Sequence, residues 1–371
     1  MRILIIMSGF FPGRNYGGPP VSVDNFCSLL KDECYIVAHN HDMGETMPYT
    51  TIHEGWNDRG NAKVMYVSNK EYRYSTFLKV ARELHPDFIY LQGLFQGCII
   101  PCLRVAQKEK IKVVLAPRGE LCAGAFSKKY KKIPYIYLLK CAGLLKNVSF
   151  QSTSDEETEA IIEYLGASPE KVHLLSNIPS VPRHLPEREV KMEGSGSFVF
   201  ISRIHPKKNL LNAIRYLKDV KGNVGFDVYG PMEDKDYWKD CERVIAELPS
   251  NITVKYQGVV GHDEIHSTFA RYNAFLFPTL SENYGHVIAE ALLSGCVPII
   301  SDQTPWTDMN EAESGWALPL SDERQFVAAI QDVVNMNDAE IKERRSHIKD
   351  YLENKLQLDA LKRSYMSVFQ K

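Results

Sequence analysis

Short apolar runs alternate with helical patterns along most of this chain, and this alternation limits the folds open to it. In the first half the apolar runs read RILIIMSG, CYIVAH, KVMYVS, FIYLQG and KVVLAPRG. Helical patterns lie between several of them, at about Val21–Leu30, at Ser75–Leu84 and up to Gln107. Strands that are apolar along their whole length are typical of a parallel sheet with helices on both faces. We therefore predict a doubly wound α/β domain here.

The amino-acid composition changes between Leu174 and Gly196, and a second set of strands and helices follows. That stretch contains several prolines and a run of mixed charges, which predict a linker. Apolar runs then resume as SFVFISR, GFDVYG, ITVKYQG, AFLFPT and VPIISD. A chain of 371 residues also exceeds the size at which one core usually stops growing. The sequence predicts two such domains, residues 1–178 and 197–355, facing a central cleft and joined by a linker at 179–196, with a C-terminal segment at 356–371.

The composition is that of an ordinary globular protein, with 44% hydrophobic and 24% charged residues. A net charge of -2 predicts no broad attraction to nucleic acid. The eight cysteines lack the CxxC or Cys/His spacing of a zinc site, so we interpret them as reduced core thiols. The first apolar run is too short for a signal peptide, and no stretch reaches the roughly 20 apolar residues of a membrane span. These features predict a cytoplasmic protein.

Ligands bind at the carboxyl ends of the strands in such sheets, so the residues just after each strand are the candidates for a site. No GxGxxG follows the first strand and GxxxxGK[ST] occurs nowhere, which removes the main support for a dehydrogenase or a P-loop enzyme and predicts no bound cofactor. The loop after the first strand reads GRNYGGPP, where Gly17 and Gly18 would let backbone amides approach an anion. A flexible turn is the alternative interpretation of this loop.

Basic residues follow the first strand of the second half, in ISRIHPKKNLLNAI. Arg203 ends that strand, and Lys207 and Lys208 stand where a helix begins. Cations at a helix N-terminus interact unfavourably with the helix dipole, and a bound anion would offset this cost. The placement therefore indicates a diphosphate. The alternative is a solvated basic loop, and we favour it for Lys207.

Two glutamates eight positions apart occupy the apolar segment LSENYGHVIAEALLSG. Glu282 lies in the loop after AFLFPT, and Glu290 lies about two turns into the helix that follows. The first helical turn carries no acidic residue, so its amides are available to an acidic ligand. A carboxylate among small apolar residues between two buried strands usually binds hydroxyl groups or a cation, although a solvated helix face is the alternative.

These segments resemble the retaining glycosyltransferases of family 4, whose fold is called GT-B. That family has an Arg and a Lys five positions apart after the first strand of the second domain, and a Glu-x7-Glu motif. Arg203 and Lys208 fit the first pattern, and Glu282 and Glu290 fit the second. With the glycine-rich loop, VYGPMED and YQGVVGHDE in the expected order, the resemblance covers nearly the whole chain. It implies two Rossmann-like domains, an acceptor domain followed by a nucleotide-sugar domain, and a C-terminal helix that packs back on the first.

The resemblance also implies a role for each matching residue. Arg203 and Lys208 hold the diphosphate in place of a metal ion, Glu282 contacts the transferred sugar, and Glu290 binds the ribose hydroxyls. The base is read near Val260, and the glycine-rich loop closes over the phosphates. The implied catalytic residues are Arg203, Lys208 and Glu282. The implied donor-binding residues are Gly17, Gly18, Arg118, Val260, Asn283, Tyr284, Gly285, His286, Val287 and Glu290.

Three positions need separate treatment. Many members of the family have a histidine where this chain has Arg118, although a sub-group with PRG is similar to it. His286 stands where an aliphatic residue is more usual, and either contacts the donor or packs at the helix start. The DxD string of Asp234 to Asp236 precedes a helix in a charged turn, so we interpret it as a solvated loop and expect no metal site.

The resemblance implies a retaining, metal-independent transferase that moves a hexose or N-acetylhexosamine from a nucleotide sugar, expected to be UDP-linked, to a lipid-linked or surface-polysaccharide acceptor. A sugar-nucleotide 2-epimerase of the same fold and a non-catalytic sugar-nucleotide-binding protein are the alternatives. Retention fits the residues, because an inverting enzyme needs a general base in the first domain and Arg118 cannot accept a proton. Glu120 is the nearest carboxylate that could serve as one.

A basic run without acidic residues, FSKKYKKIPYIYLLK, interleaves lysines with aromatic rings. Such a run is typical of a surface that touches an anionic membrane, where a lipid-linked acceptor would be presented and the protein would be peripheral. A solvated basic helix with its tyrosines in the core and a loop that binds a soluble glycan are the alternatives. The cations in question are Lys128, Lys129, Lys131, Lys132 and Lys140.

Overall fold

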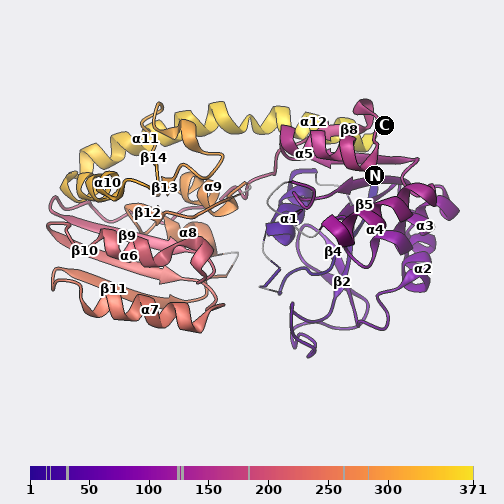
Figure 1. Ribbon diagram of the computed structural model, residues 1–371, viewed down its shortest axis with the longest axis horizontal. Helices are drawn as coiled ribbons and strands as arrows, with labels where there is room; N and C mark the ends of the chain where they lie inside the picture. Colours follow the sequence, from indigo (N-terminus) through magenta and orange to yellow (C-terminus); the bar gives the residue numbers. More distant parts are fainter. Residues whose placement is uncertain are drawn as a thin grey trace. The chain divides into compact units, whose positions relative to one another are not determined.

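The structure is a computed structural model (Figure 1), which describes residues 1–13, 15–16, 18–30, 33–122, 126, 129–182, 184–261, 264–282 and 284–370. The chain divides into two compact units. Unit 1 comprises Met1–Ile178 with Leu358–Lys371, and unit 2 comprises Pro179–Gln357. Each unit is an α/β domain built on a largely parallel sheet, so the predicted fold class is confirmed. The segment 179–196, predicted as a separate linker, is part of unit 2.

The sheet of unit 1 has eight strands in the order β3-β4-β2-β1-β5-β6-β7-β8, and all neighbours are parallel except β3 and β4. The five predicted strands are present as β1, β2, β4, β5 and β6. The others are short or polar, and they carry no long apolar run. The strands are β1 (Arg2–Ile6), β2 (Glu33–His39), β3 (Trp56–Asp58), β4 (Lys63–Val67), β5 (Phe88–Gln92), β6 (Lys112–Ala116), β7 (Val148–Ser152) and β8 (Val172–Leu174).

Helices bury both faces of this sheet. Alternate residues of β1 belong to different core clusters, with Leu4 and Ile6 in one and Ile3 and Ile5 in the other. The C-terminal helix belongs to unit 1, where the Tyr365 hydroxyl donates to the backbone oxygen of residue 176 at 3.0 Å. The helices are α1 (Gly18–Leu30), α2 (Tyr74–Leu84), α3 (Ile99–Glu109), α4 (Lys129–Cys141), α5 (Asp155–Ala160) and α12 (Leu358–Gln370), with a π-helical turn at Ile161–Leu165 and a 3-10 turn at Pro169–Lys171.

The sheet of unit 2 has six parallel strands in the order β11-β10-β9-β12-β13-β14. All five predicted strands are present, and β14 is the additional one. The strands are β9 (Ser195–Ile201), β10 (Asn223–Tyr229), β11 (Ile252–Gly258), β12 (Ala274–Phe277), β13 (Val297–Ser301) and β14 (Trp316–Leu318). The helices are α6 (Leu210–Tyr216), α7 (Lys235–Ala246), α8 (Ile265–Phe269), α9 (His286–Leu293), α10 (Glu323–Asn335) and α11 (Asp338–Leu356), with 3-10 turns at Pro206–Lys208 and Thr307–Met309.

Candidate active site

An ion pair between Lys208 and Glu282 lies at the carboxyl edge of the sheet in unit 2. The Lys208 Nζ contacts the Glu282 Oε1, although the two residues are 74 positions apart. Their side chains are only 11% and 15% exposed. A lysine and a glutamate predicted separately, from two different motifs, are therefore brought together by the fold.

Backbone and side-chain contacts fix the two loops that carry this pair. Lys208 ends a 3-10 turn, and the next residue, Asn209, is the N-cap of α6 and has a left-handed conformation with a φ of 60°. The buried Asn209 amide donates to the Pro278 oxygen at 2.8 Å. The Leu280 amide donates to the oxygen of residue 207 at 2.9 Å, and the Glu282 amide donates to that of residue 303 at 3.0 Å. Asn209 was not among the predicted site residues, and its position directly after Lys208 was the available signal.

Arg203 follows β9, as predicted, and forms an ion pair with Glu233. Its Nη1 lies 2.6 Å from the Glu233 Oε2, and both side chains are 44% exposed. A half-exposed pair of this kind contributes little to stability, so the guanidinium can exchange its partner for a ligand at small cost. Gly230 allows the close approach of the two loops, because a Cβ there would lie 1.8 Å from the oxygen of residue 202. Glu233 was missed, although it lies in the VYGPMED segment that follows a predicted strand.

Glu290 is buried in α9, where it is 6% exposed and lies between Ala289 and Ala291. The solvated-face interpretation of this residue is therefore wrong. Burial raises the pKa of its carboxyl to about 7, and burial is the only cause of that shift. A carboxylate in this position lacks a compensating cation among the residues that the structure describes. Hydroxyl groups that donate to it would offset part of that cost.

The residues before α9 form a tight turn around an indole. Gly285 caps the helix with a φ of 76°, where a side chain would be strained. The Trp306 Nε1 donates to the Tyr284 oxygen at 2.6 Å. Within the described residues the buried Tyr284 hydroxyl has no hydrogen-bond partner, and burial followed by the charge of Glu290 raises its pKa. Trp306 was missed because it comes 22 positions later in the chain, outside any motif.

The remaining donor-binding candidates of unit 2 are placed as follows. The His286 ring lies 4.8 Å from the Tyr284 ring, edge to face, in the first turn of α9. Val287 and Val260 are partly buried against the core of unit 2. Asn283 lies outside the described residues. The structure thus places His286, Val287 and Val260, and the donor contacts of all four residues stay predictions.

In unit 1 the predicted arginine is already engaged by neutral groups. Arg118 has a φ of 59° and donates through Nε to the Gln92 Oε1 at 2.7 Å and through Nη1 to the Asn177 Oδ1 at 2.7 Å. Gly18 is the first residue of α1, three positions earlier than the predicted helix start, and Gly17 lies outside the described residues. Contacts of Gly18 and Arg118 with a donor stay predictions.

Glu120, the carboxylate that could have acted as a base, is bound to the loop after β5. Its Oε2 accepts hydrogen bonds from the amides of Leu94 and Phe95 at 2.5 and 3.0 Å, and its Oε1 accepts from the Gln96 Nε2 at 3.3 Å. Both carboxylate oxygens of Glu120 are therefore engaged by residues 94–96. No pattern in the sequence predicted these contacts.

The DxD string has a structural role. The Asp234 Oδ1 accepts from the amides of residues 236 and 237 at 3.1 and 2.9 Å, which caps α7. Asp236 forms an exposed ion pair with Lys239 at 2.8 Å. This arrangement is a solvated helix start, as the sequence predicted.

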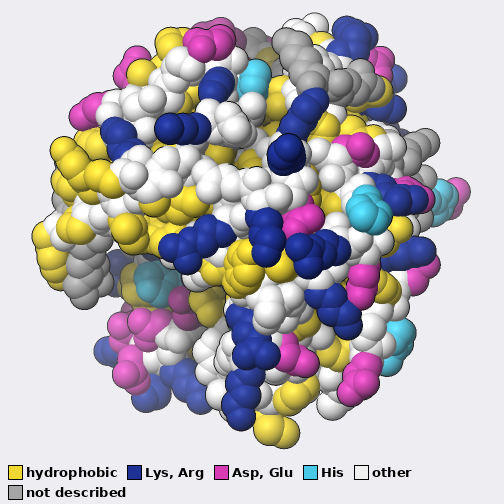
Figure 2. All heavy atoms as spheres, turned by 90° about the vertical axis from the view of Figure 1, so that its right-hand side faces the viewer, with side chains coloured by type: hydrophobic (Ala, Val, Ile, Leu, Met, Phe, Trp, Pro, Cys, Tyr) yellow, Lys and Arg dark blue, Asp and Glu magenta, His cyan; other side chains and the backbone are white. Residues whose placement is uncertain are grey.

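The basic run forms α4, which has an exposed apolar stripe that we call the α4 stripe. Its members recur at helical spacing, so they lie on one face. They are Tyr130 (72% exposed), Ile133 (41%), Tyr137 (66%) and Leu138 (54%). Figure 2 shows the side of unit 1 to which α2, α3 and α4 belong, where Lys and Arg side chains lie next to hydrophobic ones. The interpretation that placed the tyrosines of this run in the core is wrong for Tyr130 and Tyr137.

The lysines of the basic run do not all reach the surface. The Lys132 Nζ donates to the Glu120 oxygen at 3.1 Å and lies 4.5 Å from the centre of the Phe95 ring, so this lysine faces the body of unit 1. Its predicted role at a membrane is wrong. Lys140 is exposed and donates to the Tyr164 oxygen at 3.1 Å. Lys128 and the side chains of Lys129 and Lys131 lie outside the described residues.

Comparison with known proteins identifies the domain that carries the Lys208–Glu282 pair. Residues 183–354 match the family described as Glycosyl transferases group 1. Unit 2 therefore contains a glycosyltransferase group 1 domain. This domain includes Arg203, Lys208, Glu282 and Glu290, and it confirms the predicted resemblance at the level of this group.

Two curated proteins are similar in sequence. An uncharacterized 41.2 kDa protein in the cps region of Klebsiella pneumoniae is 23% identical over 302 residues, which are 76% of this chain and 78% of that protein. The UDP-N-acetylglucosamine–peptide N-acetylglucosaminyltransferase GtfA subunit of Streptococcus agalactiae is 25% identical over 183 residues, which are 46% of this chain and 34% of that one.

Solved structures with the same fold cover the whole chain. Alr3699/HepE of Anabaena, in complex with UDP and glucose, is 14% identical with a TM-score of 0.69, and the match covers 100% of this chain and 99% of that one. WaaG, a glycosyltransferase involved in lipopolysaccharide biosynthesis, is 12% identical with a TM-score of 0.65 and 99% of each chain covered. At these identities the matches establish the fold, which is GT-B. Within the described residues, none of the helices is long and apolar enough to span a membrane.

Proposed function

We propose that this protein is a retaining glycosyltransferase of family 4, which transfers a hexose or N-acetylhexosamine from a UDP-linked donor without a metal ion. The observation that carries the proposal is the Lys208–Glu282 pair at the carboxyl edge of the donor-domain sheet, with Arg203 after the first strand of that sheet. A lysine held against a carboxylate in a poorly exposed position can neutralise a diphosphate while that carboxylate binds sugar hydroxyls.

In the proposed mechanism Arg203 and Lys208 act on the leaving group. Negative charge builds on the diphosphate as the bond to the anomeric carbon breaks, and both cations stabilise it more strongly in the transition state than in the bound donor. Each donor of this type is commonly worth about 3 kcal/mol. Glu282 holds the transferred sugar from the other side of Lys208, and Glu290 accepts hydrogen bonds from the ribose.

We infer that the anomeric configuration is retained, and two groups in unit 1 support this inference. An inverting reaction needs a base opposite the leaving diphosphate. Arg118 cannot accept a proton, and the Glu120 carboxylate already accepts three hydrogen bonds. We infer that the acceptor attacks on the face from which the diphosphate departs, and that a phosphate oxygen takes its proton.

We propose a lipid-linked or surface-glycan acceptor at an anionic membrane surface. The support is the α4 stripe, where two exposed tyrosines and two exposed aliphatic residues adjoin Lys140. Tyrosine suits the interface between headgroups and acyl chains, and lysine is attracted to anionic lipid. WaaG is described as a glycosyltransferase involved in lipopolysaccharide biosynthesis, and the similar Klebsiella pneumoniae protein is described as lying in a cps region. Both descriptions agree with this proposal.

The test is a screen of nucleotide sugars by thermal shift, followed by a transfer assay. A donor that binds only the folded protein raises its melting temperature. We expect a UDP-sugar to give the largest rise, and the Lys208→Ala variant to bind it but to turn it over far more slowly. Binding without any release of UDP in the presence of glycan acceptors would favour a non-catalytic protein, and interconversion of two UDP-sugars would favour an epimerase.

A further inference from the structure

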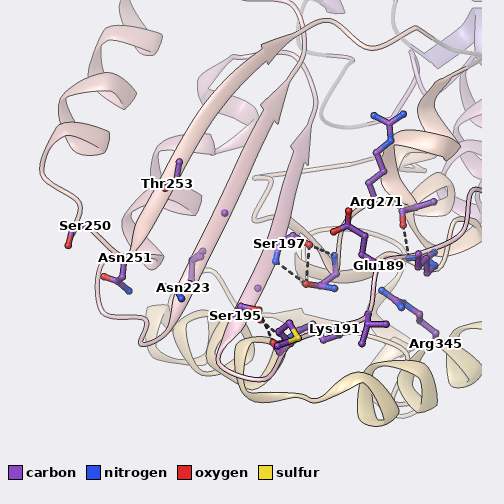
Figure 3. A pocket seen from close by; sticks show the side chains of 18 residues that line it. Glu189, Lys191, Ser195, Ser197, Asn223, Ser250, Asn251, Thr253, Arg271 and Arg345 are labelled. Atoms are coloured by element: carbon purple, nitrogen blue, oxygen red, sulfur yellow. Dashed lines mark hydrogen bonds between the residues drawn. The ribbon is translucent and has the colours of Figure 1, made fainter.

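A polar pocket of about 470 Å³ lies at the amino-terminal ends of β9, β10 and β11 (Figure 3). It is therefore at the edge of the sheet opposite to the candidate active site, since Arg203 and Lys208 follow the carboxyl end of β9. A strand of seven residues, such as β9, is about 20 Å long, so the two places are far apart within unit 2.

The pocket is basic. Four cations and one carboxylate line it, and Figure 3 shows side chains from the 188–192 segment and from Arg271 and Arg345 on one side of the strands. Arg271 is exposed. Within the described residues, none of the four cations forms an ion pair. The cations are Arg188, Lys191, Arg271 and Arg345, and the carboxylate is Glu189.

Three of these cations are held in place by neutral oxygens. Burial, followed by the charge of nearby Arg188, lowers the pKa of Arg345 to about 10, which indicates that the two guanidinium groups lie in one positive region. The charge of Asp338 acts on Arg345, and those of Glu193 and Glu340 act on Lys191, which offsets part of this positive charge. The Asp338 Oδ1 also accepts a hydrogen bond from the Lys191 backbone amide at 3.1 Å. Arg188 donates to the backbone oxygens of Ala270 and Ser294, and Arg345 donates to that of Gly295. The Lys191 ammonium group donates to the backbone oxygens of Met192, Ser195, Val334 and Met336.

The floor of the pocket is a row of small polar residues on three neighbouring strands. Ser197 of β9, Gly225 of β10 and Thr253 of β11 are in register and therefore lie on the same face of the sheet. Gly225 and Thr253 are exposed. Asn273 stands beside Ser197, whose Oγ donates to the Asn273 Oδ1 at 3.0 Å. Hydroxyl and amide groups thus face the space between the cations.

Gly225 has no structural explanation within the sheet. Its φ lies outside the left-handed region, and no atom beyond its chain neighbours lies within 4 Å of the place where a Cβ would stand. Gly196 is different, because a Cβ there would lie 2.6 Å from the Phe198 ring. Glycine weakens a strand interior and often marks a position that a ligand approaches closely. The open floor at Gly225 is therefore a second indication of a ligand, and it is independent of the charges.

We propose that this pocket is a second binding site, and that it takes an anionic saccharide, meaning a sugar that carries a phosphate or a carboxylate. Arg271 and the Arg345 guanidinium, of which only Nε is bonded to a backbone oxygen among the described residues, pair with the acidic group. Thr253, Asn273 and the floor left open by Gly225 receive the hydroxyl-bearing ring. The pocket volume suits one or two sugar rings. None of the residues that line it is aromatic, so recognition depends on charge and hydrogen bonds. The proposal does not depend on the transferase activity.

Isothermal titration calorimetry on the full chain tests the site with glucose 6-phosphate and with trigalacturonate. Glucose and inorganic phosphate are the control ligands. Arg271→Glu reverses an exposed charge that makes no side-chain hydrogen bond among the described residues. Gly225→Thr fills the floor without a clash and should leave the melting temperature unchanged or raised, because threonine suits a strand. Lys218→Glu, at an exposed lysine outside the pocket, is the matched control.

We expect saturable binding of an acidic saccharide by the wild-type protein and by Lys218→Glu, and at least tenfold weaker binding by Arg271→Glu and by Gly225→Thr. Tighter binding of glucose 6-phosphate would identify a free sugar phosphate as the ligand, and tighter binding of trigalacturonate would identify a segment of acidic glycan. Three results would overturn the proposal: no saturable binding of either probe, equal affinities in the wild type and both pocket variants, or inorganic phosphate that binds as tightly as the sugar phosphate.

Discussion

Replacing Glu290 by glutamine should stabilise the ligand-free protein at neutral and alkaline pH. Burial raises the pKa of the folded carboxyl from 4.5 to about 7. Between these values the folded state retains a proton that the unfolded state has released, so stability falls as pH rises through this window. A shift of this size corresponds to about 3 kcal/mol of unfolding free energy. The glutamine variant has no such loss.

The assay is urea denaturation of the wild type and of Glu290→Gln at several pH values from 4 to 8.5. A change in packing alters the free energy of unfolding by the same amount at every pH. The part of the difference between the two proteins that depends on pH therefore reports the titration of the Glu290 carboxyl. We expect the variant to gain about 3 kcal/mol relative to the wild type between pH 4 and pH 8. Glu242→Gln, at an exposed glutamate of α7, is the control and should give a constant difference. A constant difference for Glu290→Gln as well would refute the assignment of a buried, destabilised carboxyl.

The same substitution should weaken donor binding. Hydrogen bonds from hydroxyl groups to a charged acceptor are worth about 1.5–3 kcal/mol, so the Kd for the donor should rise about tenfold or more. Stability gained together with affinity lost is the pattern expected of a site residue. Stability gained with unchanged affinity would mean that Glu290 has no contact with the donor.

The other predictions concern the diphosphate, the metal and the membrane. Arg203→Ala and Lys208→Ala should each lower kcat about a hundredfold, with a smaller effect on the Kd for the donor, because the cations act mainly in the transition state; unchanged turnover in both variants would exclude this role. Activity should survive EDTA, and loss of activity in EDTA that manganese restores would contradict metal independence. Asp234→Ala should leave kcat unchanged and lower the free energy of unfolding by about 1 kcal/mol, because the helix cap is lost. A Tyr130→Ser, Tyr137→Ser double variant should sediment less with anionic vesicles than the wild type, and wild-type binding should weaken with salt; equal sedimentation of the two proteins would rule out the α4 stripe as a membrane contact.

The strands that the sequence predicted are those with continuous apolar runs, because burial on both faces leaves a pattern that needs no knowledge of neighbours. The missed strands lack this pattern. β3 (Trp56–Asp58) is three residues long and antiparallel, and β8 (Val172–Leu174) is equally short and only partly buried. Whether so short a segment forms a strand depends on the strand with which it pairs. The local sequence does not reveal which strand that is.

The candidate site was predicted as separate motifs, and the contacts between them were not. Lys208 and Glu282 came from two segments, and only the parallel order of β9 and β12 brings their loops together. The Arg203–Glu233 pair joins two loops 30 positions apart, and neither loop has a periodic pattern. Lys132 was predicted at the surface because its neighbours are basic, but its ammonium group lies over the Phe95 ring. The chemical character of these residues was local information, whereas their partners depended on the fold.

The anomeric configuration of the first-formed product tests the central claim most directly. Proton NMR of the product, recorded early in the reaction with an α-linked UDP-sugar, gives this configuration from the coupling constant of the anomeric proton. The cations on the leaving side, together with Arg118 and the hydrogen-bonded Glu120 in unit 1, predict an α linkage. A β linkage would contradict the retaining mechanism, even if Arg203, Lys208 and Glu290 all bound the donor as proposed.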